Sequence, residues 1–316
     1  MLDSIRFTQG AVAKKDYAPE LTHFRIKNGT IRGFNGMIGL HSPIDFDLEV
    51  SPRAVPFIKA VHACKDTIQL HVTPAGKLAV RSGKFKAFVE CLIEEFPDIP
   101  PSGEVIPLTG GILDPLKKLA PFIAEDASRP WARGILLDGQ SAFATNNLIL
   151  VEYWLGYNFP VRLNLPRAAV MELLRINEEP RLLQVDENSC TFHFEGDRWL
   201  RSTVYATAWP DIRKVLDIVG NLKKVPASLW EAITDLLPFT DDLGKIHLSP
   251  GLIETHIVDG NGASTEVQGL EGAGIFNAKQ LLLLEKIVEK IDFSNYPQPC
   301  PFVGDRLRGV IMGMRS

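Results

Sequence analysis

Polar and apolar residues alternate along most of the chain in short stretches of strand length, and helical periodicity appears between them. The clearest alternation lies in residues 21–44, where Asn28–Gly29 and Asn35–Gly36 mark two tight turns. The pattern predicts, for the first third of the chain, a helix at 2–15, strands within 21–44, a helix at 51–65, and strands at 67–74 and 83–93 that are joined by a Pro/Gly turn. In the second helix, Ser51 is the expected N-cap and Pro52 the expected first residue.

The same order of elements recurs twice more. The middle third is predicted to contain a helix at 112–123, strands within 132–155, a helix at 165–176 and strands within 180–207. Pro115 and Pro121 restrict the first of these helices to a short or broken one. The last third is predicted to contain helices at 225–237 and 277–291 and strands within 244–259 and 304–316.

A repeated phrase supports a duplication. An aromatic residue followed by Pro-Asp-Ile ends at Ile99 and again at Ile212, and a glycine (Gly83 or Gly196) stands fourteen residues before each proline. A chance match or a shared turn type is the alternative. Because order and spacing also agree, we expect an α+β protein of three repeated domains, at 1–103, 104–217 and 218–316.

Composition adds a class and a compartment. The chain has 316 residues, of which 45% are hydrophobic and 23% charged, as in a soluble protein of two or three domains. No apolar run is long enough for a membrane span, and the N-terminus does not look like a signal peptide. The four cysteines are far apart and form no CxxC pair, which argues against a zinc site or a disulfide framework. We expect a cytoplasmic protein with no membrane partner.

The charge distribution says more than the net charge of −4, which argues mildly against nucleic-acid binding. The predicted helices carry a net positive charge and leave a strongly negative remainder. The helix at 51–65 has no acid, and its Lys59, His62 and Lys65 lie opposite an apolar stripe that contains Phe57. Lysines on solvated helix faces are the ordinary explanation. A basic helix layer on an acidic body instead predicts a polyanion held against one surface.

Signals for catalysis are weak. The seven histidines show no metal-binding spacing. Residues 259–262 (DGNG) fit a hairpin turn better than a calcium loop, and residues 269–274 (GLEGAG) fit a flexible turn better than a phosphate loop. We expect no enzyme, no metal and no cofactor.

Several segments together resemble the DNA polymerase III β sliding clamp, including its phage-type members. They are GAVAKKDYAPELTHFRI, KLAVRSGKFKAFVECLIEEFPDI, LPRAAVMELLRI, AWPDIRKVL and the closing GVIMGMRS, in that order over essentially the whole chain. The resemblance implies three domains of one fold, each with two helices on antiparallel sheet, forming half of a ring. Two chains joined head to tail would enclose double-stranded DNA, which the helices would contact without reading sequence. A DNA polymerase and a clamp loader would be partners, in the bacterial cytoplasm or nucleoid or in a phage-infected host. The alternative is a phage structural protein that forms a ring without DNA.

The resemblance also implies a pocket for partner peptides between the second and third domains. The matching positions are Thr145, Leu148, Leu150, Pro210, Lys214, Val215, Val310, Ile311, Met312, Gly313, Met314 and Arg315. These residues could instead be ordinary interdomain core. The chain departs from the family at residues 145–149 (TNNLI, for an Asp-Gly-His-Arg run), at Lys214 (for arginine), at Gly313 (for proline) and at Ser316 (for leucine).

DNA contacts come partly from the resemblance and partly from the charge pattern. Lys14 and Lys15 match the basic end of the family's first helix, and Arg129 matches a loop at the inner rim. The charge pattern adds Lys59, Lys65, Lys117, Lys118, Arg167, Arg175, Lys223, Lys224 and Lys279. Each of these could also be an ordinary solvated side chain.

Overall fold

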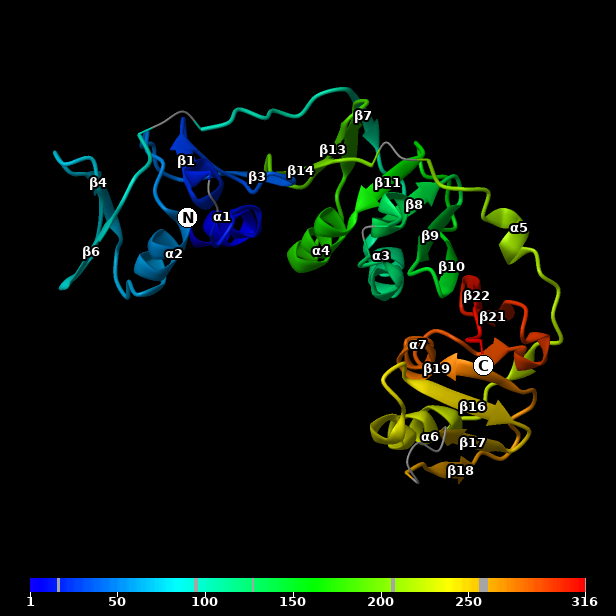
Figure 1. The fold of residues 1–316 in the computed structure, drawn as a ribbon. Coiled ribbons are helices and arrows are strands. Elements are labelled where there is room, and N and C mark those ends of the chain that lie inside the picture. The colour runs from blue at the N-terminus through cyan, green and yellow to red at the C-terminus, as the bar shows by residue number, and fades with distance from the viewer. Residues whose placement is uncertain (16–17, 94–95, 127, 206–207, 256–260, 316) are drawn as a thin grey trace. The chain divides into compact units, whose positions relative to one another are not determined.

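The computed structural model describes residues 1–15, 18–93, 96–126, 128–205, 208–255 and 261–315. Its contacts divide the chain into two compact units. Unit 1 comprises residues 1–113 and 168–204, and unit 2 comprises residues 114–167 and 205–316. Helices and antiparallel strands occur in both units, which confirms the α+β class (Figure 1).

Unit 1 is built on a seven-stranded sheet of order β1-β2-β3-β14-β13-β12-β7. Its strands are β1 (Phe24–Lys27), β2 (Thr30–Phe34), β3 (Ile38–Pro43), β7 (Glu104–Pro107), β12 (Leu182–Val185), β13 (Ser189–His193) and β14 (Trp199–Thr203). A second, three-stranded sheet contains β4 (Gln69–Val72), β5 (Leu78–Ser82) and β6 (Phe85–Val89). The helices are α1 (Leu2–Thr8), α2 (Ala54–His62), the 3-10 turns η1 (Gln9–Ala11) and η2 (Pro19–Thr22), and α4 (Arg167–Ile176), of which all but the first residue belongs to unit 1.

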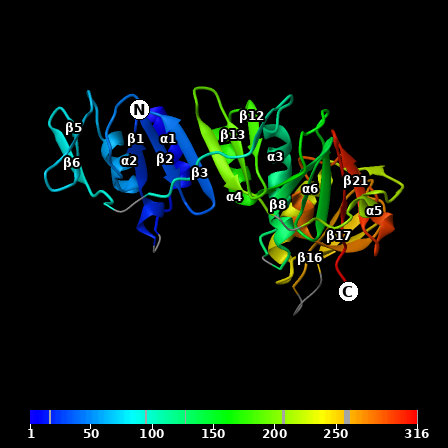
Figure 2. The same cartoon turned by 90° about the horizontal axis from the view of Figure 1, so that it is seen from above.

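The two faces of the larger sheet in unit 1 differ in chemistry. Ile5 of α1 and Phe57 of α2 join a buried core with Phe24 and Ile26 of β1, so the helices cover this face. Period-two alternation sends the intervening side chains, such as Arg25, to the opposite face. We call the two sides the helix face and the open face (Figure 2).

Unit 2 is built on an eight-stranded sheet of order β11-β8-β9-β10-β22-β21-β20-β15. Its strands are β8 (Gly134–Asp138), β9 (Ser141–Thr145), β10 (Ile149–Trp154), β11 (Leu163–Pro166), β15 (Lys223–Lys224), β20 (Lys290–Ile291), β21 (Cys300–Gly304) and β22 (Leu307–Ile311). A four-stranded sheet contains β16 (Lys245–Ser249), β17 (Leu252–Thr255), β18 (Ser264–Glu266) and β19 (Gly274–Asn277). The helices are α3 (Leu113–Leu119), α5 (Arg213–Leu216), α6 (Ser228–Leu236), α7 (Ala278–Leu282) and the 3-10 turns η3 (Ala120–Phe122), η4 (Pro130–Arg133), η5 (Leu237–Phe239) and η6 (Phe293–Asn295).

The eight-stranded sheet also has a helix face and an open face. Tyr153 of β10 is buried on the helix face, where its hydroxyl donates to Asp114 of α3 at 2.6 Å. Burial and this contact raise the pKa of Tyr153 to about 12. Leu150, three residues earlier on the same strand, faces the other way and packs against Phe143 and Trp209.

One hairpin occurs in both units with the same local geometry. The side-chain Oδ1 of Asn35 accepts from the N–H groups of Met37 and Ile38 and closes the β2–β3 turn. Asn146 does the same for Leu148 and Ile149 in the β9–β10 turn. The repeated hairpin supports the duplication predicted from the sequence.

Strands from different thirds of the sequence pair side by side in both large sheets. β3 pairs with β14 in unit 1, and β10 pairs with β22 in unit 2. The compact units therefore do not follow the predicted boundaries after residues 103 and 217, because each large sheet crosses one of them. The three-domain division remains a prediction about the repeats.

Several predicted helices are shorter than expected. The helix predicted at 2–15 is α-helical only to Thr8, so Lys14 and Lys15 follow it. The helix predicted at 277–291 ends at Leu282, because Lys290 and Ile291 form a strand that pairs with β15 and β21. Apolar residues at helical spacing can satisfy either structure, and the neighbouring strands decide.

Two other expectations were wrong. Ser51 is not the N-cap of α2 and Pro52 is not its first residue, because Arg53 is the N-cap and the helix begins at Ala54. The backbone groups of Val50 and Pro52 instead bond to β1. Strand β5 was not predicted, although Leu78 and Val80 are fully buried in it. Strand β5 is followed at once by the turn to β6, so the sequence does not mark the two as separate strands.

Within the part of the chain that the structure describes, no helix is both long and apolar enough to cross a membrane. The four cysteines are free thiols.

Candidate nucleic-acid interface and peptide-binding site

The predicted peptide-binding residues lie close together within unit 2. They come from the β9–β10 hairpin, the linker that contains α5, and β22 with the residues after it. Leu150 and Val310 are direct partners in the β10–β22 pair, and the Met312 N–H donates to the Leu148 carbonyl at 2.7 Å. Residues far apart in the sequence thus meet on one surface.

An apolar cluster lies beneath this surface, on the open face of the sheet. It consists of Leu136, Phe143, Leu150, Trp209, Leu216 and Val310. A hollow of about 280 Å³ borders it, with Phe143, Trp209, Pro210 and Ile212 in its wall. Sequence matching missed Leu136, Phe143 and Trp209, although the alternation in β8 and β9 could have placed the first two on the same face as Leu150.

Three large apolar side chains of the predicted set are exposed. The exposed fractions are 38% for Leu148, 39% for Val215 and 38% for Met312. Thr145 and Ile311 are buried, and the Thr145 hydroxyl donates to the Ile149 carbonyl at 2.7 Å. The first three can therefore contact a ligand directly, whereas Thr145 and Ile311 support the surface from below.

The departures from the family have local explanations. Asn146 holds the hairpin turn and donates through Nδ2 to Gln280 of α7 at 2.6 Å, so this turn is tied to the neighbouring helix. A Cβ at Gly313 would overlap the ring of Tyr296. The Tyr296 hydroxyl in turn donates to the Met314 carbonyl at 2.8 Å. The backbone at residues 313–314 thus packs directly against Tyr296, which leaves no room for a side chain at residue 313.

The charged residues of the predicted site lie at its edge. The Lys214 side chain is 85% exposed and forms an ion pair with Asp211 at 3.5 Å. Arg315 and Pro210 are exposed. Ser316 lies outside the described residues.

The predicted DNA-contacting cations fall into three groups. Lys59 on α2, Lys117 on α3 and Lys279 on α7 are exposed on helices, as the charge pattern predicted. A second group is exposed but lies outside helices: Lys14, Lys15, Lys65, Arg129, Lys223 and Lys224. Lys223 is also paired with Glu271 at 3.2 Å.

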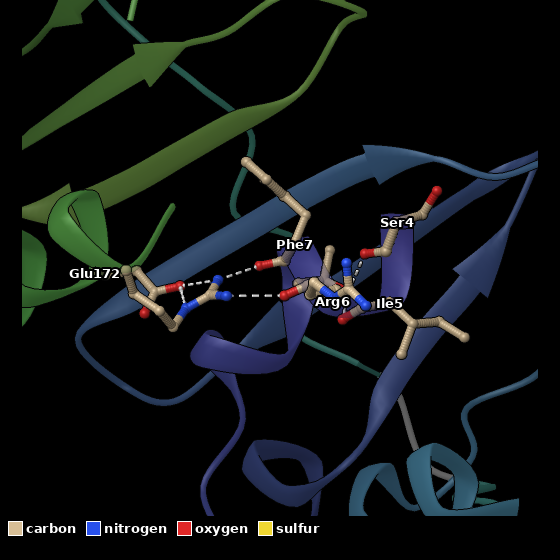
Figure 3. Close-up of polar contacts among 7 residues, drawn as sticks. Ser4, Ile5, Arg6, Phe7 and Glu172 are labelled. Carbon is tan, nitrogen blue, oxygen red and sulfur yellow. Dashed lines mark hydrogen bonds and ion pairs between the residues drawn. The ribbon is translucent and has the colours of Figure 1, made fainter. Parts of the chain in front are cut away.

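A third group of predicted cations is engaged within the protein. Arg175 donates to the Arg6 carbonyl at 2.9 Å, to the Phe7 carbonyl at 2.6 Å, and to Oε1 of the buried Glu172 (Figure 3). Its guanidinium therefore binds the last turn of α1, and we withdraw Arg175 as a DNA contact. The predicted role was inferred from charge alone, which does not reveal a partner 168 residues away.

Lys118 and Arg167 are partly committed to neighbours. Lys118 lies 3.7 Å from both Asp114 and Asp305. Arg167 donates to the Ile123 carbonyl at 3.3 Å and pairs with an exposed Glu125. Both remain predicted contacts, but weaker ones than Lys59, Lys117 and Lys279, which form no ion pair with the residues that the structure describes.

The basic helix layer is less complete than the sequence suggested. Helix α6 carries Glu231 and Asp235 and no basic residue. Lys223 and Lys224 belong to β15 and not to a helix, so they do not balance these acids on the helix layer. The positive charge of the last third therefore rests mainly on Lys279 among its helices.

The described residues include no group of three or more His, Cys, Asp or Glu that could hold a metal ion. Burial and nearby Arg32 lower the pKa of His41, which stacks on Trp199, to about 4. The lowered pKa of His41 therefore results from its packing in the sheet.

Comparisons with known proteins give the fold. Neither a protein-family model nor a curated protein matches the chain by sequence. Solved structures do match: the DNA polymerase β subunit of Streptococcus pyogenes (17% identity, TM-score 0.85), the DNA polymerase III subunit beta of Bartonella birtlesii bound to griselimycin (17%, 0.85) and the sliding clamp of Pseudomonas aeruginosa (19%, 0.83). Each match covers 100% of this chain and 97% of the other. The chain therefore has the fold of the DNA polymerase III β sliding clamps.

Proposed function

We propose that the protein is a non-enzymatic sliding clamp that encircles duplex DNA and tethers a DNA polymerase. The observation that carries this proposal is the match over the whole chain to β clamps of known structure. Exposed Lys59, Lys117 and Lys279 on the helices are suited to phosphates, which every DNA sequence presents alike. Retention would then come from the closed ring and not from tight binding.

Ring closure would use two chains joined head to tail. Within the chain, the strand after the turn asparagine of one repeat already pairs with the last strand of the next repeat, as β3 does with β14 and β10 with β22. By the same rule β18 of one chain would pair with β6 of its partner, since each stands at the edge of a smaller sheet. Phe88 on β6 is 54% exposed and would be covered there.

The partner peptide of a polymerase or a clamp loader would bind across Leu148, Val215 and Met312. Val215 follows Trp209 and Pro210, which line the hollow, in the same linker, and its neighbour Leu216 belongs to the apolar cluster. Leu148 and Met312 lie two residues from Leu150 and Val310 of that cluster. Methionine and aliphatic side chains adapt to several ligands, which suits a surface shared by different partners.

Retention on DNA with blocked ends tests the proposal. The protein is incubated with linear duplex DNA, the ends are then capped with streptavidin, and the DNA is washed at high salt. A ring stays on capped DNA and slides off uncapped DNA. Equal loss from both would contradict encirclement and favour a structural ring without DNA.

Charge reversal tests the lining. Lys59→Glu, Lys117→Glu and Lys279→Glu together should reduce retention, because they replace three phosphate-facing cations by acids. Lys77→Glu in the exposed β4–β5 turn is the matched control and should have no effect.

Sedimentation of Phe88→Asp tests closure. The variant should sediment as one chain where the wild type sediments as two. A wild type of one-chain mass at micromolar concentration would contradict the head-to-tail dimer.

A further inference from the structure

The linker phrase that occurs twice in the sequence lies in the same place on both large sheets. In unit 2, Trp209, Pro210 and Ile212 line the hollow on the open face. In unit 1, Phe96, Pro97 and Asp98 line a hollow of about 370 Å³ on the open face. Ile99 packs there so closely that a Cβ at Gly39 would meet its Cδ1 at 2.8 Å. Each large sheet therefore has a hollow between its first strands and the aromatic-Pro-Asp-Ile linker.

The two hairpins allow the hollows to be compared residue by residue. Arg32 stands three residues before the turn asparagine of β2–β3, as Phe143 does before that of β9–β10. Arg25 is the cross-strand partner of Arg32, and Leu136 is that of Phe143. Two neighbouring apolar residues in the second hollow are thus replaced by two arginines in the first.

The first hollow has more cations than carboxylates. Arg25, Lys27 and Arg32 line it, and the carboxylates that pair with them are Glu49 and Asp98. A single oxygen of Glu49 accepts from both Arg25 and Lys27 at 2.7 Å, and Asp98 accepts from Arg32 at 2.7 Å. Among the residues that the structure describes at this hollow, one positive charge is left over, in a chain whose net charge is −4.

The guanidinium groups are positioned and their present partners are exchangeable. The side chains of Arg25 and Arg32 are only 27% and 33% exposed, whereas Glu49 and Asp98 are 61% and 77% exposed. Arg32 is also oriented by its Nε, which donates to Nδ1 of His41 at 3.2 Å. Ion pairs with such exposed carboxylates are weak, so a carboxylate from another molecule can replace them.

We propose that this hollow binds an acidic segment of a protein partner, whose carboxylates replace Glu49 and Asp98 at Arg25 and Arg32. Phe96 and Pro97 supply an apolar wall for the segment. The assignment to a peptide rests on the proposed function, since the equivalent hollow of unit 2 contains Pro210 of the proposed peptide site and borders its apolar cluster. DNA is the less suitable occupant, because the helices with the proposed phosphate contacts cover the opposite face of this sheet.

Fluorescence anisotropy tests the proposal with a short labelled peptide of alternating Asp and Phe. Arg32→Gln and Arg25→Gln should each weaken binding about tenfold, because each removes a charge-assisted contact. Asp98→Asn should tighten binding, because it removes an internal competitor for Arg32. Asp235→Asn, at an exposed acid of α6 away from both hollows, is the matched control and should leave the affinity unchanged.

Opposite signs for Arg32→Gln and Asp98→Asn would support a carboxylate site, since a general loss of structure weakens binding in both variants. The proposal is overturned if Arg32→Gln binds like the wild type, or if a twin peptide with Asn in place of Asp binds equally well. Displacement of the peptide by millimolar inorganic phosphate would make this a small-anion site, and displacement by a short DNA duplex would make it a DNA contact. Either result overturns the peptide assignment.

The end-capping assay separates this proposal from the proposed function. Arg32→Gln should be retained on capped DNA like the wild type. If the wild type is not retained on capped DNA, the proposed clamp function is contradicted. The opposite effects of Arg32→Gln and Asp98→Asn on peptide affinity would still test the hollow independently.

Discussion

Replacing Arg175 by alanine should loosen the attachment of α1 to α4. The guanidinium binds the carbonyls of Arg6 and Phe7 at the end of α1, where helix carbonyls have no partner within the helix. It also pairs with Glu172, which is only 6% exposed. The change therefore leaves two backbone acceptors and one buried carboxylate without this donor.

The expected cost follows from these contacts. Breaking a buried ion pair by removing one partner typically costs about 3–5 kcal/mol. Because the Arg175 side chain is itself 33% exposed, water can reach part of the site, and we expect the lower end, about 3 kcal/mol. A cost of this size is large compared with the usual margin of domain stability.

Hydrogen exchange at residues 2–11, measured by mass spectrometry, reports this attachment directly. Arg175→Ala should lower the opening free energy of that segment by about 3 kcal/mol. In a Glu172→Gln background the same change should cost clearly less, because no charge is left buried. Gly10→Ala is a second route to the same loss, since its Cβ would overlap the Glu172 carboxylate.

The energies of the three variants must be coupled if the reasoning holds. Gly10→Ala should add little to Arg175→Ala, because both disrupt the same contacts. A loss below about 0.5 kcal/mol for Arg175→Ala, or full additivity with Glu172→Gln, would refute the assigned role and return Arg175 to the list of solvated cations.

Three further predictions concern packing. The folded state holds the pKa of His41 at about 4, below its ordinary 6.5, so the unfolding free energy should fall as the pH drops from 6.5 through 4. His41→Phe should remove this part of the pH dependence. His62→Phe, at an exposed helix position, is the control and should leave it unchanged. The pKa of Tyr153 is raised from 10 to about 12, so its contribution to the unfolding free energy is lost as the pH rises from 10 through 12. Tyr153→Phe should reduce the pH dependence of the unfolding free energy in that range. Asn277 caps α7, and Asn277→Ala should lower the thermal midpoint by the equivalent of about 1 kcal/mol.

Local features could be predicted from the sequence because neighbours along the chain create them. The hairpins at Asn35 and Asn146 have their turns at residues whose side chains bond to the backbone of the turn. The buried stripe of α2 at Phe57 and the breaking of the helix near Pro121 also followed from local pattern. The repeated linker phrase correctly indicated two equivalent places in the fold.

Other features depended on partners that are distant in sequence. Residues 283–291 have a helical pattern, yet Lys290 and Ile291 become a strand because β15 and β21 lie beside them. Arg175 looked like a free cation until α1 was placed against it. The predicted wall of the unit 2 hollow was incomplete for the same reason, since Leu136 belongs to β8, a strand that supplied none of the matched residues.

The sequence by itself thus determined the repeated elements, the α+β class and the residues that could carry each function. Tertiary structure decided which strands from different thirds pair, which cations are already bound, and which chemistry each of the two equivalent hollows presents. The physical reason is range: turns and amphipathic stripes arise from residues a few positions apart. Sheet pairing and ion pairing instead depend on which segments the folded chain brings together.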